Sequence, residues 1–238
     1  MKKIILVLIL TTTFTETFGC SCSSMKITNA YSILDFIGII EFKSLTEIEN
    51  NYGIYKSTFE IKELFKGKEN EKIFVDSMKD SSCSFIPQKN SKYLIFGYKN
   101  TDGKIMTSFC LAQGNPDKRS LSILRYLKKK KIENEISSNL RQTLNNEINS
   151  NLFEKAINGI FLYKVILNSD LRIKEILPSN ENAKRNFNEK IRKELTSKIG
   201  YKINEVDKGI RTENLISYII LTWEYNYEND KIITTTKL

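Results

Sequence analysis

Apolar residues in the first half of the chain occur in short runs of strand length, and polar turn signals separate these runs. The runs are residues 36–42, 55–65, 72–75, 93–98 and 105–110. Lys66-Gly67-Lys68, the serines near residue 81 and the segment 100–103 read as turns. Asp102-Gly103 tolerates the positive φ of a tight hairpin. About five closely spaced strands predict a small barrel or sandwich.

The pattern changes after Gly114-Asn115-Pro116, and we place a domain boundary there. Leu121, Leu124 and Leu127 follow helical spacing. Apolar residues then recur every four positions, at Ile132, Ile136, Leu140, Leu144, Ile148 and Leu152. This stripe predicts an amphipathic helix in the segment 115–152. The opposite face carries Asn, Glu and Arg rather than dense lysine, which favours a helix that covers a core over a membrane helix.

A second region of β pattern begins at residue 159. The segments 161–167, 172–177 and 215–223 read as strands, and the segment 168–170 reads as a turn. The segment 183–199 reads as one helix, with three apolar side chains on one face: Phe187, Ile191 and Leu195. The order ββαβ predicts a small α+β domain over residues 153–238, with one helix across its sheet.

The chain begins with a pattern typical of a secretory signal. Met1-Lys2-Lys3 precedes the apolar run 4–10, which is too short to span a bilayer as a helix. Small residues at Thr17 and Gly19 suit cleavage just before Cys20. We therefore expect residues 1–19 to be removed and the protein to be secreted or to enter the periplasm or cell envelope. No later segment is apolar and long enough for a transmembrane helix.

Composition supports a folded chain of one large or two modest domains after the signal. Cleavage leaves 219 residues (238 minus 19), of a chain with 40% hydrophobic and 27% charged residues. All four cysteines, at positions 20, 22, 83 and 110, lie at or after the cleavage point. An even number in an exported chain predicts two disulfides, and the residues alone leave three pairings open. A zinc site of all four cysteines stays an alternative, although Cys83 and Cys110 are not part of a CxxC knuckle.

The absence of histidine narrows the chemistry. The sequence contains no histidine, which excludes Ser-His-Asp and Cys-His catalysis and HExxH metalloproteases. It has no glycine-rich phosphate loop either. We expect a protein that is not an enzyme and needs no cofactor. Paired carboxylates such as Asp35 and Asp102 remain as an alternative, but Asp35 is better read as ordering the chain before a strand and Asp102 as part of a hairpin.

Basic charge suggests anionic partners of several kinds. The net charge is +9 and the pI is near 9.2. Such a charge can attract nucleic acid, anionic lipid or an acidic protein face. Export argues against a genomic target, so we expect no nucleic-acid partner. The densest basic run, residues 128–131, is interpreted as the solvated start of a helix.

Several motifs occur together in the first half of the chain. Cys20-Ser21-Cys22 stands at the expected mature start, residues 59–67 end in Phe-Lys-Gly, and Ser81-Ser82-Cys83 forms a Ser-x-Cys segment. Residues 93–97 and the hairpin that closes at Cys110 follow in order. Together they resemble the netrin-like inhibitory domain of the tissue inhibitors of metalloproteinases, over residues 20–113. The resemblance implies a five-stranded, OB-like netrin barrel in a first domain of residues 20–114.

The resemblance also implies disulfides Cys20–Cys83 and Cys22–Cys110, and a mode of inhibition. The α-amine and carbonyl oxygen of a mature N-terminal Cys20 would chelate the catalytic zinc of a target metalloprotease. Ser21 would enter the specificity pocket of that protease, with Ser81 and Ser82 beside it. The alternative is that these residues only anchor the N-terminus to the barrel.

The sequence departs from the family in three places. Ser32 stands where the first cysteine of a further disulfide is expected, and Ser23-Ser24-Met25 replaces a proline-rich stretch. The part after Gly114 contains no cysteine and does not resemble the disulfide-rich second domain of the family. The fold could therefore be kept while inhibition is lost.

The competing hypothesis is a bacterial envelope binding module without inhibitory activity. Residues 153–227 faintly resemble the ββαβ C-terminal domain of TonB-type proteins. Phe18-Gly19-Cys20 partly matches a lipobox, with Thr17 where an aliphatic residue is usual. An outer-membrane lipoprotein would carry lipid on the Cys20 sulfur and an acyl group on its amine. Lipidation would thus abolish both the Cys20–Cys83 disulfide and zinc chelation.

Overall fold

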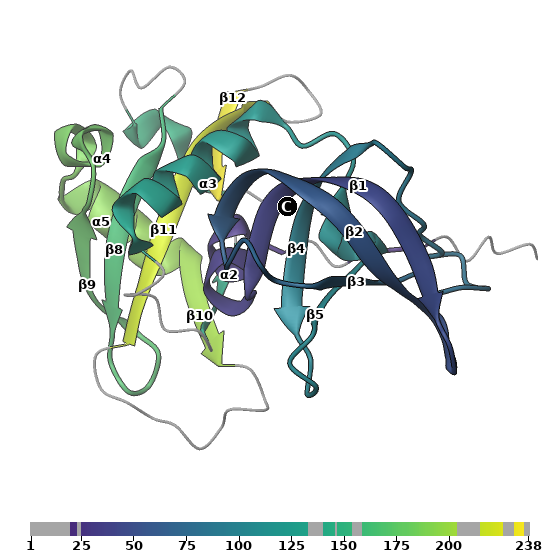
Figure 1. Cartoon of the computed structure of the whole chain (residues 1–238). Coiled ribbons are helices and arrows are strands. Elements are labelled where there is room, and N and C mark those ends of the chain that lie inside the picture. Colours follow the sequence, from purple (N-terminus) through teal and green to yellow (C-terminus); the bar gives the residue numbers. More distant parts are fainter. Residues whose placement is uncertain are drawn as a thin grey trace, which may run out of the picture.

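The computed structural model describes residues 20–22, 25–132, 140–145, 147–153, 159–203, 215–225 and 231–235. The first part is a closed five-stranded barrel (Figure 1). Its strands are β1 (Phe36–Ile48), β2 (Asn51–Lys66), β3 (Ile73–Asp76), β4 (Lys92–Lys99) and β5 (Ile105–Ser108). They pair in the order β1-β2-β3-β5-β4, and β4 pairs back with β1 to close the barrel. The β3–β5 pair is parallel, and the others are antiparallel.

Alternating side chains fill this barrel. Its core consists of Phe36, Ile40, Phe42, Ile73, Val75, Ile95 and Ile105. A side chain would not fit at Gly97 of β4, where β4 lies close to β1 and β5. A Cβ at this position would collide with the side chain of Ile105 and come within 3.3 Å of the Phe36 Cβ. All five predicted runs are strands, but β1 and β2 continue well beyond the predicted ends as a long hairpin. The extra length alternates polar residues with single apolar ones and is partly exposed, so it contains no continuous apolar run that would have indicated a strand.

The predicted hairpin between β4 and β5 is confirmed. Gly103 has a φ of +76°, as the Asp-Gly pair predicts. Asn100 organises the turn, because its side-chain oxygen accepts hydrogen bonds from the backbone N–H groups of Asp102 (3.1 Å) and Lys104 (2.9 Å). Asn100 N and Lys104 O also pair at 2.9 Å. The turn thus sets the register in which β5 returns toward Cys110.

The later part of the chain is built on a four-stranded antiparallel sheet. Its strand order is β12 (Lys231–Thr235), β11 (Leu215–Tyr225), β8 (Phe161–Leu167) and β9 (Ile173–Pro178). Further described elements are α2 (Ile27–Ile33), β6 (Ala112–Gln113), α3 (Lys118–Lys130), β7 (Leu140–Leu144), α4 (Glu181–Asn186), α5 (Glu189–Lys198) and β10 (Ile199–Ile203). Short 3₁₀ turns cover Phe109–Leu111 and Ser150–Leu152. Figure 1 shows α3 crossing between the barrel and this sheet.

Two strands of this sheet, β8 and residues 215–222 of β11, are buried on both faces. Leu162, Tyr218 and Ile220 point to one face and share a core with α2, α3 and barrel residues such as Leu94 and Phe96. The alternate residues point to the other face, where a second core includes Phe161, Tyr163, Val165, Ile191, Leu195, Ile219 and Leu221. Burial on both faces explains why β8 and β11 read as nearly continuous apolar runs. The barrel and the sheet are therefore joined by one shared core.

The predicted helix over residues 115–152 is only partly correct. Leu121, Leu124 and Leu127 lie on α3, as expected. Leu140–Leu144 is instead strand β7, which pairs with β10, and Leu152 ends a 3₁₀ turn. Ile136 lies outside the described residues. Leu140 and Leu144 also fit an alternating strand pattern, and the asparagines of this region favour turns over helix interiors.

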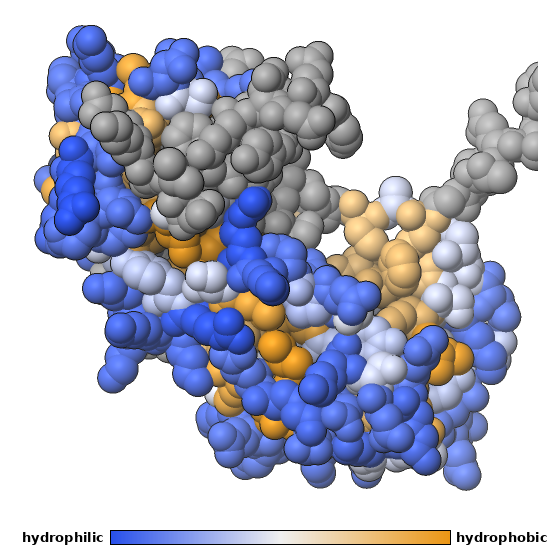
Figure 2. All heavy atoms as spheres, turned by 90° about the horizontal axis from the view of Figure 1, so that it is seen from above, coloured by the Kyte–Doolittle hydropathy of each residue, from blue (hydrophilic) through white to orange (hydrophobic). Residues whose placement is uncertain are grey.

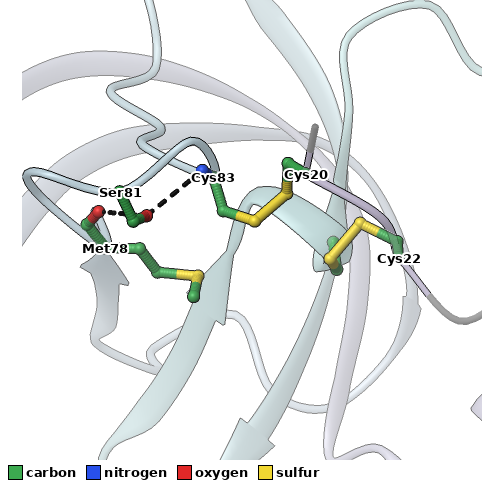
Figure 3. Close-up of a disulfide and its surroundings, with 6 residues drawn as sticks. Cys20, Cys22, Met78, Ser81 and Cys83 are labelled. Atoms are coloured by element: carbon green, nitrogen blue, oxygen red, sulfur yellow. Dashed lines mark hydrogen bonds between the residues drawn. A yellow bond between two sulfur atoms is a disulfide. The ribbon is translucent and has the colours of Figure 1, made fainter. Parts of the chain in front are cut away.

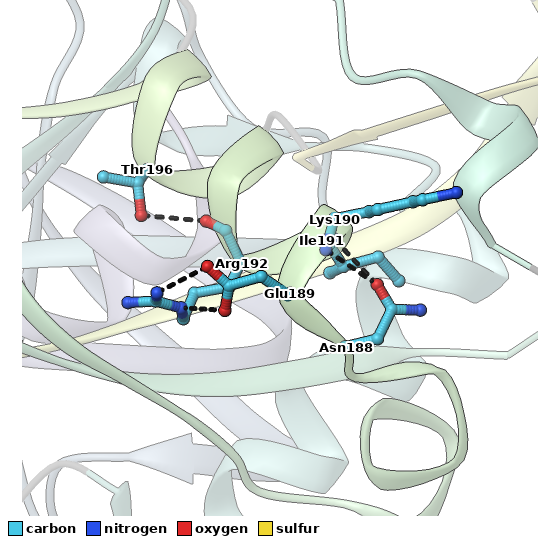
Figure 4. Close-up of polar contacts among 6 residues, drawn as sticks. All are labelled: Asn188, Glu189, Lys190, Ile191, Arg192 and Thr196. Atoms are coloured by element: carbon cyan, nitrogen blue, oxygen red, sulfur yellow. Dashed lines mark hydrogen bonds and ion pairs between the residues drawn. The ribbon is translucent and has the colours of Figure 1, made fainter.

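Two further predictions, on where helices begin and end, are wrong, and the capping residues show why. The basic run 128–131 lies at the end of α3, not at a helix start, because Asp117 caps the N-terminus of α3 and Lys131 ends it with a φ of +52°. The single helix predicted over residues 183–199 is two helices. Asn188 interrupts it and caps α5, accepting hydrogen bonds from the N–H groups of Lys190 and Ile191 (Figure 4).

The C-terminal sheet is also more elaborate than ββαβ. The three predicted strands correspond to β8, β9 and β11, and the predicted turn at residues 168–170 lies between β8 and β9. Strands β10 and β12 have no counterpart in the prediction. Within the part of the chain that the structure describes, no helix is long and apolar enough to cross a bilayer.

Candidate functional site

Two disulfides hold the start of the described chain against the barrel. Cys20 is bonded to Cys83 and Cys22 to Cys110, which is the pairing that the resemblance implies. The bonded residues are 63 and 88 positions apart in the sequence. Figure 3 shows the two bonds next to each other. All four sulfurs are bonded in pairs, so a site of four zinc-binding thiolates is not formed.

The loop after β3 is shaped by its own hydrogen bonds. The Ser81 hydroxyl donates to the carbonyl oxygen of Met78 (2.6 Å) and accepts from the N–H of Cys83 (3.1 Å; Figure 3). The N–H of Phe85 donates to Ser77 O at 2.8 Å and closes the loop. Met78 has a φ of +47°, which a non-glycine residue adopts rarely. Ser81 therefore positions Cys83, and through it Cys20, while the neighbouring Ser82 is exposed.

Ser21 lies between the two disulfides with its side chain exposed. The sulfur atoms of Cys20, Cys22 and Cys110 all lie within 4.8 Å of one another. The Cα atoms of Cys20 and Cys83 are 4.9 Å apart, so this disulfide joins the segment that carries Ser21 to the loop that carries the exposed Ser82. The residues predicted to contact a protease, Ser21, Ser81 and Ser82, thus belong to two segments that the Cys20–Cys83 disulfide joins. Ser21 lies between Cys20 and Cys22, and a disulfide ties each of these two neighbours to the barrel.

Partly exposed apolar side chains belong to the same loops. Met78 is 40% exposed, Ile86 is 53% exposed and Phe109, next to Cys110, is 39% exposed. Phe85 packs edge to face against Phe109 and Tyr93, with ring centroids 6.4 and 5.7 Å apart. Figure 2 shows hydrophobic patches among hydrophilic residues on the face that it draws. The sequence prediction did not single out these exposed side chains, although Phe109 is the sequence neighbour of Cys110.

The tip of the β1–β2 hairpin lies against the loop after β3. The Tyr52 hydroxyl donates to the Asp80 carboxylate at 2.5 Å, and this hydrogen bond raises the pKa of Tyr52. Glu47 accepts from the N–H of Gly53 (3.0 Å), which lowers the pKa of Glu47, and it pairs with Lys79 (3.5 Å). A hollow of about 510 Å³ at this tip is lined by Glu47, Ile48, Glu49, Asn50, Tyr52 and Lys79. These contacts give the hairpin tip a fixed position beside the Cys83 loop.

Three residues considered in the sequence have structural contacts elsewhere. The Asp35 carboxylate accepts a hydrogen bond from the N–H of Lys99 at 2.6 Å, and so ties the start of β1 to β4. Asp102 is exposed in the hairpin, 3.6 Å from the Lys104 ammonium. Ser32, at the position of the expected family cysteine, donates its hydroxyl to Asn29 O within α2 (2.8 Å). The contacts of Asp35 and Asp102 are therefore made with different residues, Lys99 and Lys104.

Comparison with known proteins adds no family. No protein-family model matches the chain, and no curated protein is significantly similar to it in sequence.

Proposed function

We propose that the protein is an exported inhibitor of a zinc metalloendopeptidase, with a netrin-like domain over residues 20–114. The observation that carries this proposal is the position of Ser21, exposed between two disulfides at one edge of the barrel. The strand order 1-2-3-5-4-1, with a parallel β3–β5 pair, is consistent with the five-stranded OB architecture of that domain. The protein would act as a partner of an enzyme and not as an enzyme itself.

The inhibitory chemistry would come from Cys20. After cleavage before this residue, its α-amine and its carbonyl oxygen could form a five-membered chelate on a metal. A catalytic zinc keeps one position open for water, and the chelate would displace that water. An α-amine has a pKa of about 7.7–8.0, so a useful fraction is neutral at physiological pH and can donate its lone pair. Ser21 would then enter the first specificity pocket of the protease, and Ser82 would contact its rim.

Rigidity supports this function energetically. A flexible N-terminal segment would lose conformational freedom on binding, which weakens affinity. The two disulfides remove most of that freedom before binding. In the chain-entropy account, closing loops of 63 and 88 residues also stabilises the fold by roughly 4 kcal/mol each. The partly exposed Met78 and Phe109 are of the residue types that are enriched in protein interfaces, and Ile86 adds further exposed apolar area beside them.

The decisive experiment compares two N-termini. One preparation of the mature protein begins at Cys20, and the matched control carries one extra alanine before Cys20. The extension keeps both disulfides but replaces the α-amine of Cys20 with an amide that cannot bind zinc. We expect the first preparation to inhibit at least one member of a broad panel of zinc metalloendopeptidases, and the control to lose at least 100-fold in affinity, roughly the effect of about 3 kcal/mol. Equal inhibition by both, or no inhibition across the panel, would refute the proposal.

The state of Cys20 in the native host separates this function from the lipoprotein alternative. A sulfur bonded to Cys83 cannot also carry a lipid thioether. For the inhibitor we expect a free N-terminal Cys20 and an intact mass four hydrogens below that of the reduced chain, since each of two disulfides removes two. A diacylglycerol-modified, acylated Cys20 would exclude the zinc chelate and leave an anchored binding module.

A further inference from the structure

The solvent-facing side of α3 and its C-cap is basic along its whole length. Apart from Ser122, every exposed residue from position 118 to position 131 is basic. These residues are Lys118, Arg119, Arg125, Lys128, Lys129, Lys130 and Lys131. This fully described stretch contains no acidic residue. Favourable interaction with the helix dipole explains basic residues in the last turn only, and not those at its beginning, where they are unfavourable.

Two of these residues have a structural role. Arg125 forms a bidentate ion pair with Glu63 of β2, at 2.8 and 2.7 Å, and Lys128 donates to the carbonyl oxygen of Leu64 at 2.7 Å. These contacts fix α3 against the barrel. Lys118, Lys129 and Lys131 form no ion pair with a described residue. Glu63 neutralises Arg125, and the Asp117 carboxylate at the N-cap interacts with Arg119, so the positive charge of this side comes mainly from its five lysines.

The basic residues form a straight charged ridge along the exposed side of α3, and the apolar residues on the opposite side are packed in the shared core. Lys118, Ser122, Arg125 and Lys129 follow the spacing i, i+4, i+7 and i+11, so they line one side of the helix. The helix has 13 residues and is therefore about 20 Å long. Its opposite side carries Ile123, Leu124 and Leu127, each fully buried in the shared core. The helix therefore cannot insert an apolar face into a membrane, and any surface it meets is met through charge.

We propose that this face of α3 docks the protein peripherally on a surface of anionic phospholipid headgroups. A cluster of four to eight basic residues on a helix is the pattern that such surfaces attract. Five of the seven residues are lysines, whose compact charges suit mobile phosphates, whereas fixed bidentate recognition favours arginine. Tyr126 is the one aromatic residue of α3, and it lies under the Lys130 ammonium at 5.9 Å, so α3 has no row of stacking rings for single-stranded nucleic acid.

Docking through α3 would leave the segment 20–22, which is proposed to contact the protease, free to bind. It does not depend on that proposed function. α3 packs against the C-terminal sheet and β2, whereas the disulfides join the start of the chain to the loops after β3 and β5. In Figure 1, α3 lies toward the C-terminal sheet and the barrel extends away from it. The proposal therefore stands or falls independently of zinc chelation.

The test measures sedimentation of the mature protein with vesicles of phosphatidylcholine, alone or mixed with phosphatidylglycerol. The α3 variant combines Lys118→Gln, Lys129→Gln and Lys131→Gln. The control variant combines Lys89→Gln, Lys190→Gln and Lys202→Gln, which remove the same charge from exposed positions on other elements. Each surface lysine contributes about five-fold to affinity for an anionic membrane, so we expect the α3 variant to bind on the order of 100-fold more weakly. We expect the control to retain most of its binding, and salt to release the unmodified protein.

Three outcomes would overturn the proposal. One is equal loss in the two variants, which would show an unspecific effect of net charge. Another is no sedimentation of the unmodified protein with phosphatidylglycerol vesicles at low salt. The third is tighter binding to heparin or duplex DNA than to the vesicles, with loss in the α3 variant, which would assign the same ridge to another polyanion. Circular dichroism melts of both variants establish that each is folded, since exposed substitutions of this kind change stability little.

Discussion

At the scale of single residues, Tyr163 of β8 is an unusual member of the C-terminal core. Its side chain is fully buried, and its hydroxyl has no hydrogen-bond partner among the described residues. Burial raises the pKa of Tyr163 because the ionised phenolate would lose its hydration. By contrast, the buried Tyr31 donates its hydroxyl to the carbonyl oxygen of Phe65 at 3.3 Å. A comparison of the two tyrosines therefore distinguishes the free-energy cost of burying a hydroxyl group from the free energy gained when that hydroxyl forms a hydrogen bond.

We predict that Tyr163→Phe leaves stability unchanged or raises it by roughly 1 kcal/mol, because the substitution removes a desolvated hydroxyl without a partner. Tyr31→Phe should instead lower stability by about 1 kcal/mol, because it leaves the Phe65 carbonyl without this donor. Urea denaturation of both variants measures the difference. A loss of more than about 1 kcal/mol for Tyr163→Phe would show that the Tyr163 hydroxyl is hydrogen-bonded in the folded protein and would contradict this prediction.

The advantage of Tyr163→Phe should also grow in alkali. An unfolded tyrosine ionises near pH 10, whereas the raised pKa keeps folded Tyr163 protonated. Above pH 10 the unfolded chain thus binds fewer protons, and stability falls as pH rises. Phenylalanine has no proton to lose, so this contribution is absent in the variant. Between pH 10 and the raised pKa of folded Tyr163, the difference in stability between the two proteins should increase by about 1.4 kcal/mol per pH unit.

At the scale of elements, short polar side chains decide where helices begin, and apolar spacing alone misplaces them. The Asn188 side-chain oxygen accepts from Lys190 N (3.0 Å) and Ile191 N (3.1 Å) and starts α5 (Figure 4). Asn180 does the same for α4 through Ala183 N (2.9 Å). The Glu189–Arg192 ion pair on α5 is exposed and contributes little. The cap is therefore the main local determinant of this helix start.

We predict that Asn188→Ala lowers the free energy of unfolding by about 1 kcal/mol, because two N–H groups of the first turn lose their acceptor. Asn188→Asp should retain most of the stability, since Asp is an equally good N-cap. Lys193→Ala, at an exposed position within the same helix, is the matched control and should change stability by less than about 0.5 kcal/mol. The three variants are compared by chemical denaturation. If Asn188→Ala has no more effect than Lys193→Ala, the cap does not contribute as described.

The sequence predicts some elements better than others for identifiable reasons. The barrel strands were recognised because turn signals such as Asp102-Gly103 separate short apolar runs. The apolar residues from Ile132 to Leu152 led to a wrong prediction of a continuous helix, because they recur at helical spacing. The polar residues between them include several asparagines, which favour turns. The disulfide pairing came from a family resemblance and not from the residues themselves. The exposed Met78 and Ile86 could not be predicted, because exposure of an apolar side chain depends on the fold around it.

At the scale of the whole molecule, the main feature is the core that the barrel and the C-terminal sheet share. Leu94 and Phe96 come from the barrel, Leu124 from α3, and Leu162 and Tyr218 from the sheet. These residues are far apart in the sequence, and their packing leaves no local pattern. The only sequence sign is that β8 and β11 are apolar on both faces, which requires a cover on each side of the sheet. We infer that the two parts stabilise each other.

We predict that Leu124→Ala destabilises both parts at once. Leu124 is fully buried, and removal of a buried leucine side chain typically costs about 2–5 kcal/mol. Because this side chain lies in the shared core, amide hydrogen exchange should become faster in barrel strand β4 and in sheet strand β8. Leu195→Ala, an equal deletion in the core on the other face of the sheet, is the matched control and should affect β8 more than β4. If exchange in β8 is unchanged by Leu124→Ala, the sheet does not depend on the barrel, and the chain consists of two independently stable domains.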